Sequence, residues 1–142
     1  MKTTSSSKSG IPVDILFVDD ASNLRRTMQL WLETQGYSTI TAKSAAEAEQ
    51  LATEKFPRIV ITDLGLPDCS GYALIEALRK TNPDRQACFI ALSGDTDGTE
   101  KEKALRTGFD FFIGKPPDFG ELSQTLQACL QAQSEDPATA TN

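Results

Sequence analysis

Five short apolar runs, each followed by a segment with helical spacing, constrain the fold of this chain more than any other feature of its sequence. The runs are nearly continuous in apolar character, and they cover residues 13–18, 37–42, 58–63, 87–94 and 109–114. Such runs are typical of strands that helices bury on both faces. Strands that alternate with helices form right-handed βαβ units around a parallel sheet. The sequence therefore predicts a doubly wound (βα)5 α/β fold with helices on both faces and strand order 2-1-3-4-5.

The helical segments carry start and stop signals. Gly36 is expected to end the first helix, and Ser44 and Glu47 are expected to form a capping box before an Ala-rich helix. Apolar side chains at helical spacing predict further helices around residues 72–81 and 122–129, and residues 97–108 are expected to form a short, highly charged helix. These signals agree with the strand pattern and favour the same fold class.

The two ends of the chain differ in composition from the middle. Residues 1–10 are polar and Ser-rich, and residues 132–142 are also polar, so both are expected to be disordered tails or linkers. The remaining residues, 11–131, have the length of one ordinary domain. The sequence thus predicts a single domain between two linker-like ends.

Charge and composition exclude several classes of function. The net charge of −6 argues against a free-standing nucleic-acid binder and against adsorption to an anionic membrane. The chain has no signal-peptide pattern and no apolar run long enough to span a bilayer, so we expect a cytoplasmic protein. Because the chain contains no histidine, imidazole bases and Ser/His triads are excluded.

The cysteines show no metal-binding or redox motif. Cys69, Cys88 and Cys129 are odd in number and widely spaced. This pattern predicts three reduced thiols in a cytosolic protein.

Charged and hydroxyl side chains follow four of the predicted strands. Asp19 and Asp20 come after the first strand, Asp63 ends the third, Ser93 ends the fourth and Lys115 follows the fifth. In open α/β sheets, ligands bind outside the carboxyl ends of the strands at the topological switch point. Strands 1 and 3 are neighbours in the predicted order, so we expect the three carboxylates to converge there.

Three converging carboxylates need a compensating charge. Each pair about 4 Å apart costs roughly 4 kcal/mol at an effective dielectric constant of about 20. A hard divalent cation offsets this repulsion, and Ser93 and Lys115 are suitable donors to phosphoryl oxygens. Taken singly, each of these residues has an ordinary explanation as a cap, a turn residue or a surface charge. Together they indicate a metal-assisted phosphate site in which Asp19 and Asp20 hold the metal and Asp63 forms an aspartyl-phosphate.

Four motifs, "VDDASNLRR", "ITDLGLPDCSGYALI", "ALSG" and "FFIGKP", resemble those of the receiver domains of bacterial two-component response regulators, chemotaxis regulators among them. The resemblance covers about residues 13–130 and implies a flavodoxin-like fold. It implies that Asp63 accepts a phosphoryl group. It also implies that Asp19, Asp20, Asp63 and the backbone carbonyl of Gly65 bind Mg²⁺, with Mn²⁺ as a substitute.

The same resemblance assigns roles to the other strand-end residues. Ser93 matches the hydroxyl that contacts the phosphoryl group, and Lys115 matches the lysine that pairs with it, in a cis peptide to Pro116. Phe112 matches an aromatic switch position that moves with Ser93. The chain would be a signalling phosphoacceptor and not an enzyme, apart from supporting its own phosphotransfer and slow autodephosphorylation.

The resemblance also implies partners. The phosphoryl donor would be a histidine kinase or a histidine phosphotransfer protein. The surface formed by the fourth helix, fifth strand and fifth helix, around residues 100–112 and 119–130, would bind a downstream protein or a second copy of the chain. No direct contact with nucleic acid or membrane is expected. The sequence leaves open whether the receiver acts alone or is a segment of a larger regulator or hybrid kinase.

Three other functions are weighed against this interpretation. A phosphohydrolase of the haloacid dehalogenase type needs a second aspartate two residues after the nucleophile, where this chain has Gly65. A flavin carrier needs a Ser/Thr-rich phosphate loop, and the acidic "DDASN" would repel the phosphate. A scaffold that has kept the fold without phosphorylation is the third alternative.

Overall fold

The structure, a computed structural model, describes residues 13–94 and 98–134. The tail predicted at residues 1–10 and most of the one predicted at 132–142 lie outside these ranges. The strands are β1 (Ile15–Val18), β2 (Thr39–Ala42), β3 (Ile59–Asp63), β4 (Cys88–Ser93) and β5 (Phe111–Gly114). The helices are α2 (Ser22–Thr34), α3 (Ala45–Glu54), α4 (Gly71–Thr81), α5 (Thr99–Thr107) and α6 (Phe119–Ser134).

The strands form one parallel sheet in the order β2-β1-β3-β4-β5. The doubly wound, flavodoxin-like arrangement predicted from the sequence is therefore confirmed. The register aligns Val18 of β1 with Thr62 of β3, and Ser93 of β4 with Gly114 of β5. Residues that follow β1 and end β3 consequently meet at one edge of the sheet, which we call the carboxyl edge.

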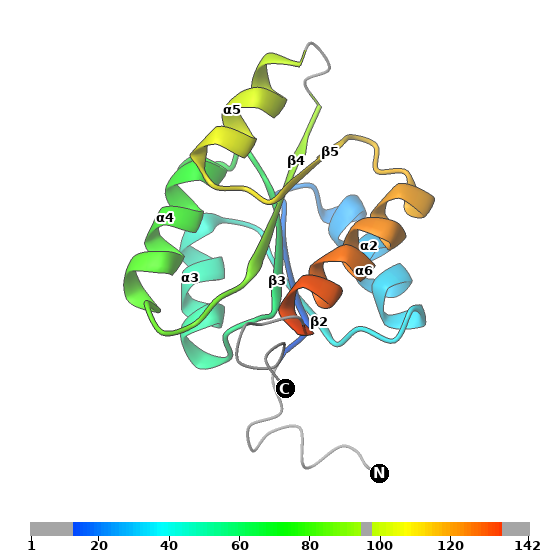
Figure 1. The fold of residues 1–142 in the computed structure, drawn as a ribbon, viewed down its shortest axis with the longest axis horizontal. Helices are drawn as coiled ribbons and strands as arrows, with labels where there is room; N and C mark the ends of the chain where they lie inside the picture. The colour runs from blue at the N-terminus through cyan, green and yellow to red at the C-terminus, as the bar shows by residue number, and fades with distance from the viewer. Residues whose placement is uncertain (1–12, 95–97, 135–142) are drawn as a thin grey trace.

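Helices cover both faces of the sheet (Figure 1). Helices α3, α4 and α5 lie on one face, and α2 and α6 lie on the other. Each face has its own cluster of buried apolar side chains, because consecutive strand residues such as Val60 and Ile61 point to opposite faces. The central strands are buried throughout, which explains why their sequences are continuously apolar.

Local signals in the sequence define the first two helices as predicted. Gly36 lies just beyond α2 at a φ of +95°, and its N–H donates to the carbonyl of Glu33. At α3, the Ser44 hydroxyl accepts a hydrogen bond from the Glu47 N–H. The Glu47 carboxylate accepts one from the N–H of Lys43, one residue earlier than in the usual capping box.

Helix α6 extends further than the sequence suggested. It continues to Ser134, so residues 132–134 belong to the helix and not to the predicted tail. No proline or glycine occurs in residues 121–134. The side-chain amide of Gln133 donates a hydrogen bond to the carbonyl of Arg58, 2.8 Å away, which fastens the last turn to the start of β3.

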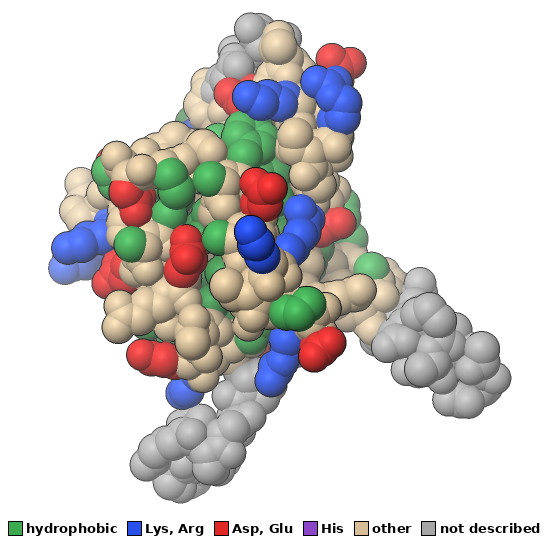
Figure 2. All heavy atoms as spheres, turned by 90° about the vertical axis from the view of Figure 1, so that its left-hand side faces the viewer, with side chains coloured by type: hydrophobic (Ala, Val, Ile, Leu, Met, Phe, Trp, Pro, Cys, Tyr) green, Lys and Arg blue, Asp and Glu red, His purple; other side chains and the backbone are tan. Residues whose placement is uncertain are grey.

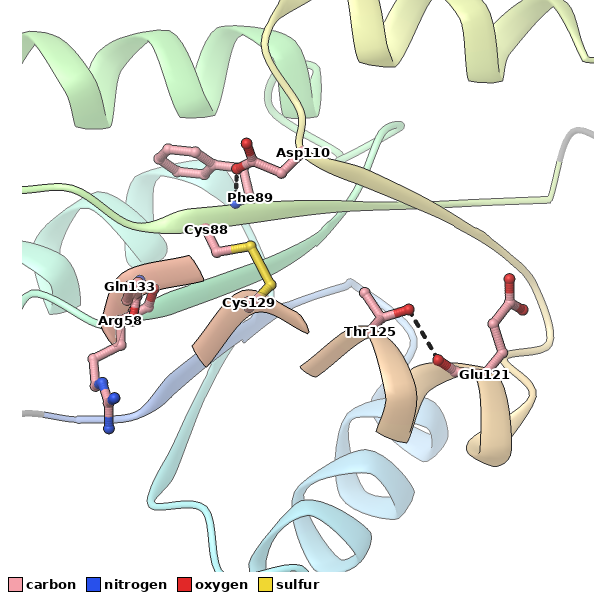
Figure 3. Close-up of a disulfide and its surroundings, with 8 residues drawn as sticks. All are labelled: Arg58, Cys88, Phe89, Asp110, Glu121, Thr125, Cys129 and Gln133. Atoms are coloured by element: carbon pink, nitrogen blue, oxygen red, sulfur yellow. Dashed lines mark hydrogen bonds between the residues drawn. A yellow bond between two sulfur atoms is a disulfide. The ribbon is translucent and has the colours of Figure 1, made fainter. Parts of the chain in front are cut away.

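The prediction of three reduced thiols is wrong. Cys88, the first residue of β4, and Cys129 of α6 form a disulfide, and Cys69 is the free cysteine (Figure 3). The two residues are 41 positions apart, yet the packing of α6 on the sheet brings their Cα atoms to 5.8 Å. Spacing along the chain does not reveal such a pair, because only the packing of helix on sheet makes them neighbours.

Figure 2 shows the side of the molecule on which α3, α4 and α5 lie. Acidic and basic side chains are interspersed there, with hydrophobic side chains between them. Among the described residues visible in that view, neither sign of charge forms a broad patch. In the ranges that the structure describes, every helix is too short or too polar to cross a bilayer.

Candidate functional site

Three carboxylates converge at the carboxyl edge of the sheet, as predicted. Asp19 and Asp20 directly follow β1, and Asp63 is the last residue of β3. The neighbouring strands hold them so that one oxygen from each carboxylate lies within 4.8 Å of one from each of the others. Asp19 is fully buried, Asp63 is half-buried and Asp20 is exposed. The cluster therefore runs from the core to the surface.

Asp19 is held from several sides. Its Oδ1 accepts a hydrogen bond of 2.9 Å from the N–H of Ala21, and its own N–H donates to the carbonyl of Ala42. The guanidinium of Arg25 donates to its backbone carbonyl. Its Oδ2 is buried and has no hydrogen bond of regular geometry within the described protein. That oxygen is instead in ionic contact with Lys115.

Lys115 supplies the positive charge of the cluster. It follows β5, and its N–H donates to the carbonyl of Ser93, 2.8 Å away. Its Nζ lies 2.8 Å from Oδ2 of Asp19 and 3.2 Å from Oδ2 of Asp63. The peptide bond from Lys115 to Pro116 is cis, as the resemblance implied. The lysine thus bridges the carboxylates that β1 and β3 deliver.

The charges around Lys115 determine its protonation. Burial by itself lowers the pKa of Lys115, because it disfavours the charged ammonium. The close contact of the ammonium with the Asp19 carboxylate and the negative charges of Asp19 and Asp63 outweigh burial, so that the pKa of Lys115 is raised above its ordinary value of 10.5. Lys115 is therefore a cation at neutral pH.

The donor set suits a hard divalent cation. One ammonium against three carboxylates leaves two negative charges uncompensated. Mg²⁺ prefers one or two carboxylates completed by water and phosphate oxygens. The buried Oδ2 of Asp19, which has no regular hydrogen bond, is the kind of oxygen that a cation satisfies. Asp19, Asp20 and Asp63 thus form an acidic pocket that can bind a metal.

The remaining predicted residues surround this cluster. Ser93 ends β4 beside Gly114 and is 6% exposed. Gly65 lies two residues beyond Asp63, and its N–H donates to Oδ1 of Asp63 at 3.3 Å. Phe112 of β5 is half-buried and packs against the apolar cluster on the α3-α4-α5 face. Contacts or short distances thus join six of the predicted residues: Asp19, Asp20, Asp63, Gly65, Ser93 and Lys115.

The structure adds site residues that the sequence analysis did not assign. Arg25 holds the backbone of Asp19, and both belong to the quoted motif "VDDASNLRR". Gly71, the first residue of α4, packs so closely on β3 that a Cβ would lie 2.6 Å from the carbonyl oxygen of Asp63. Asp68 lies outside the acidic cluster, and it accepts hydrogen bonds from the N–H groups of Ala45 and Ala46 at the start of α3. A glycine at the start of a helix was the one signal that could have indicated such close packing.

Comparisons with known proteins identify the family. A family model described as "Response regulator receiver domain" matches residues 15–127. The transcriptional regulatory protein KdpE of Mycobacterium tuberculosis (strain ATCC 25618 / H37Rv) is 35% identical over 133 residues, which are 90% of this chain and 58% of that protein. An uncharacterized 14.6 kDa protein of Leptolyngbya boryana is 32% identical over 119 residues, 83% of this chain and 91% of that protein.

Solved structures agree with these sequence matches. The crystal structure of a CheY-like response regulator receiver domain protein from Methanospirillum hungatei JF-1 superposes with a TM-score of 0.79 at 26% identity, over 89% of this chain and 99% of that one. This chain spans little more than half the length of KdpE. The fold, the family model and the relatives lead to one conclusion: the chain belongs to the family of response regulator receiver domains, the signalling domains of two-component systems.

Proposed function

We propose that this chain accepts a phosphoryl group in a His-Asp phosphorelay, and that Asp63 is the residue that receives it. The observation that carries the proposal is the position of the Asp63 carboxylate. Its side chain is 14% exposed, and its Oδ2 lies 3.2 Å from Nζ of Lys115. Asp19 is fully buried, so an incoming phosphohistidine cannot reach it. Asp63 alone in the described cluster combines a route from solvent with a contact to the lysine.

The proposed reaction is an in-line displacement. A carboxylate oxygen of Asp63 attacks the phosphorus of a phosphohistidine, and an O–P bond forms as the P–N bond breaks and the departing imidazole takes a proton. The chain has no histidine, so this donor belongs to a histidine kinase or a histidine phosphotransfer protein. The ammonium of Lys115 pairs with the negative phosphoryl oxygens. A divalent cation, Mg²⁺ or in its place Mn²⁺, held by Asp19, Asp20, Asp63 and the carbonyl of Gly65, would neutralise the remaining charge there.

The proposed switch starts from the new charge. A phosphoryl group adds about −1.5 to −2 charges at neutral pH. We assign Ser93 as the hydroxyl donor to one of its oxygens, supported by the hydrogen bond that joins its carbonyl to Lys115. Phe112 then moves with β4 and β5, and the surface of α5, β5 and α6 changes shape. That output surface, around residues 100–112 and 119–130, would bind a downstream protein or a second copy.

Location and boundaries belong to the same proposal. A partner kinase with its phosphohistidine in the cytoplasm implies a cytoplasmic receiver, and the net charge of −6 disfavours direct contact with nucleic acid or anionic membrane. Residues 11–131 would be the receiver unit, either alone or inside a larger regulator or hybrid kinase.

Phosphorylation by a small donor tests the assignment of Asp63. The protein is incubated with acetyl phosphate and Mg²⁺, and its intact mass is measured before and after hydroxylamine. We expect the wild type to gain one phosphoryl group that hydroxylamine removes, and Asp63→Asn to gain none. Asp68→Asn is the matched control, because Asp68 lies in the loop that follows Asp63 but outside the acidic cluster.

The outcomes separate the alternatives. Equal labelling of Asp63→Asn would show that another residue accepts the group. Absence of label on the wild type, with no effect of beryllium fluoride and Mg²⁺ on its melting temperature, would support the scaffold without phosphorylation. Multiple turnovers of phosphate esters would instead indicate a phosphohydrolase.

A further inference from the structure

The disulfide between Cys88 and Cys129 lies in a part of the molecule that the proposed phosphorylation does not use. Cys88 begins β4, whereas Ser93, the proposed hydroxyl donor, ends the same strand at the carboxyl edge. Cys129 lies in the C-terminal half of α6 (Figure 3). Both belong to the apolar cluster on the α2-α6 face. The disulfide therefore ties α6 covalently to the amino end of the central sheet.

A pocket leads to this disulfide. It has a volume of about 900 Å³ and lies at the amino end of β3 and β4. Both cysteines line it, together with Arg58, Ala87 and Gln133. Cys88 is 8% exposed and Cys129 is fully buried, so a molecule in the pocket meets the Cys88 side of the disulfide first.

We propose that Cys88 and Cys129 form a redox site that a small thiol reaches through this pocket. The thiolate of the small molecule attacks Sγ of Cys88, the bond between the two cysteines breaks, and the thiolate of Cys129 leaves and takes a proton. A second thiolate attacks the mixed disulfide on the sulfur of the small molecule. This step releases the oxidised small-molecule disulfide and the thiol of Cys88. Two thiols thus supply the two electrons, and an oxidised small-molecule disulfide reverses the reaction.

Opening the disulfide loosens the end of α6. Beyond Cys129, Leu130 packs on the apolar cluster and Gln133 donates its hydrogen bond to the carbonyl of Arg58. Those contacts are few and noncovalent, whereas the disulfide holds α6 to β4 covalently across 41 positions and removes conformational entropy from the unfolded chain. The residues from Cys129 to the end of α6 would thus respond to the redox state of the pair. Any effect of this loosening on the output surface depends on the proposed function, whereas the redox chemistry of the pair does not.

Counting thiols tests the chemistry directly. The variant Cys69→Ala leaves only the pair to react, because Cys69 is the free, exposed cysteine. It is oxidised with glutathione disulfide, desalted, treated natively with dithiothreitol for different times, and alkylated in denaturant for mass measurement. We expect no alkyl group before reduction and two afterwards, at a rate proportional to the dithiothreitol concentration.

Two results would overturn the redox site. Two free thiols after treatment with glutathione disulfide would show that the disulfide does not form. A reduction rate independent of dithiothreitol concentration, or no native reduction, would show that the pocket does not admit a thiol and that the disulfide opens only on unfolding. The double variant Cys69→Ala/Cys88→Ala is the control: it cannot form the pair, so before reduction it should carry either one alkyl group or one glutathione, and after reduction one alkyl group.

Hydrogen exchange tests the consequence for α6 without any phosphorylation. On reduction of Cys69→Ala we expect amides of the helix beyond Cys129 to exchange at least tenfold faster, while amides of β1 keep their protection. The melting temperature should fall by about 10 °C. Unchanged exchange in α6 would refute the loosening. Because neither measurement involves Asp63, failure here leaves the proposed phosphorylation intact.

Discussion

At the scale of single residues, the ion pair of Asp19 and Lys115 is the contact whose loss would cost the site most stability. Asp19 is fully buried, and the ammonium 2.8 Å from its Oδ2 is the cation that compensates it. Removal of one partner from a buried ion pair is costly, because the other charge stays buried without compensation. Stability and charge balance in this site therefore depend on the same lysine.

Replacing Lys115 should destabilise the protein in a way that Mg²⁺ reverses. We expect Lys115→Met to lower the free energy of unfolding by about 2–4 kcal/mol in the presence of a chelator. Millimolar Mg²⁺ should restore more than half of this loss, because a cation bound by the carboxylates replaces the missing charge. Urea denaturation with and without Mg²⁺ measures both effects. Lys80→Met, at an exposed position of α4, should change stability by less than about 0.5 kcal/mol.

A loss on Lys115→Met that Mg²⁺ leaves unchanged would contradict this account. It would mean that the lysine acts mainly by packing and not through charge.

Asp68 contributes stability that depends on pH. Hydrogen bonds from the N–H groups of Ala45 and Ala46 lower the pKa of Asp68 below its ordinary value of 3.8. A carboxyl whose pKa is lower in the folded state stabilises the protein above the pKa that it has when unfolded, and this contribution is lost as the pH falls through the folded value. We therefore expect Asp68→Asn to melt at a lower temperature than the wild type at pH 7, and the difference to shrink below pH 3.8.

Melting curves of both proteins between about pH 2.5 and 7 measure this difference. Asp84→Asn, at another exposed carboxyl, serves as the control. If the difference in melting temperature between wild type and Asp68→Asn stays constant down to the lowest pH, the ionised carboxylate plays no role at the start of α3.

At the scale of secondary-structure elements, the start of α4 fixes the backbone position of Asp63. Gly71 has no side chain, so the first turn of α4 packs directly on the end of β3. The N–H of Gly71 also donates to the carbonyl of Leu64, and the Ser70 hydroxyl accepts a hydrogen bond from Ala73 as N-cap. The contact between helix and strand holds the backbone from which the Asp63 side chain projects.

A methyl group at position 71 should disturb this contact. In Gly71→Ala, the Cβ would lie 2.6 Å from the carbonyl oxygen of Asp63 and 3.1 Å from Cα of Leu64, both backbone atoms. We expect a loss of about 1–3 kcal/mol in stability and slower labelling of Asp63 by acetyl phosphate. Denaturation and intact-mass kinetics measure the two effects.

Gly65→Ala is the matched control for stability, because a Cβ there has no atom within 4 Å. Its stability alone is compared, since Gly65 belongs to the proposed cation site. If Gly71→Ala proves as stable as Gly65→Ala, the helix can move aside for the added methyl group, and close packing of α4 on β3 does not limit stability.

At the scale of the whole molecule, the sheet separates two apolar clusters. One is packed by α3, α4 and α5 and contains Ile75, and the other is packed by α2 and α6 and contains Ile113. Ile75 and Ile113 belong to different clusters on opposite faces of the sheet. Packing changes in one cluster should consequently have little effect on the other.

A double-mutant cycle tests this independence. Ile75→Val and Ile113→Val should each lower stability by about 0.5–1.5 kcal/mol, and the double variant should show the sum to within about 0.5 kcal/mol. The comparison pair is Ile90→Val with Ile113→Val, which share one cluster on the paired strands β4 and β5. Equal coupling in the two cycles would contradict the separation of the molecule into two layers.

Much of the architecture could be predicted because its signals are local. The apolar runs, the capping pair Ser44 and Glu47 and the stop at Gly36 depend on residues close together in the sequence, and the structure confirms them. The convergence of the three aspartates was predictable once the strand order was assumed, because parallel strands deliver their carboxyl ends to one edge. The extra turn of α6 was missed because the bond that anchors it reaches Arg58, 75 positions away along the chain.

The sequence by itself determined the alternation of strands and helices and the acidic residues that end the central strands, and the strand order was taken from the order common to such folds. Only the tertiary structure decided that Cys88 and Cys129 are bonded, that Gly71 lies against the backbone of Asp63, and that Lys115 contacts both Asp19 and Asp63. The physical reason is that all three contacts depend on how the elements pack together. Periodicity and capping follow from neighbouring residues, whereas these contacts join residues that only the packing of helices on the sheet and the pairing of its strands bring within a few ångströms.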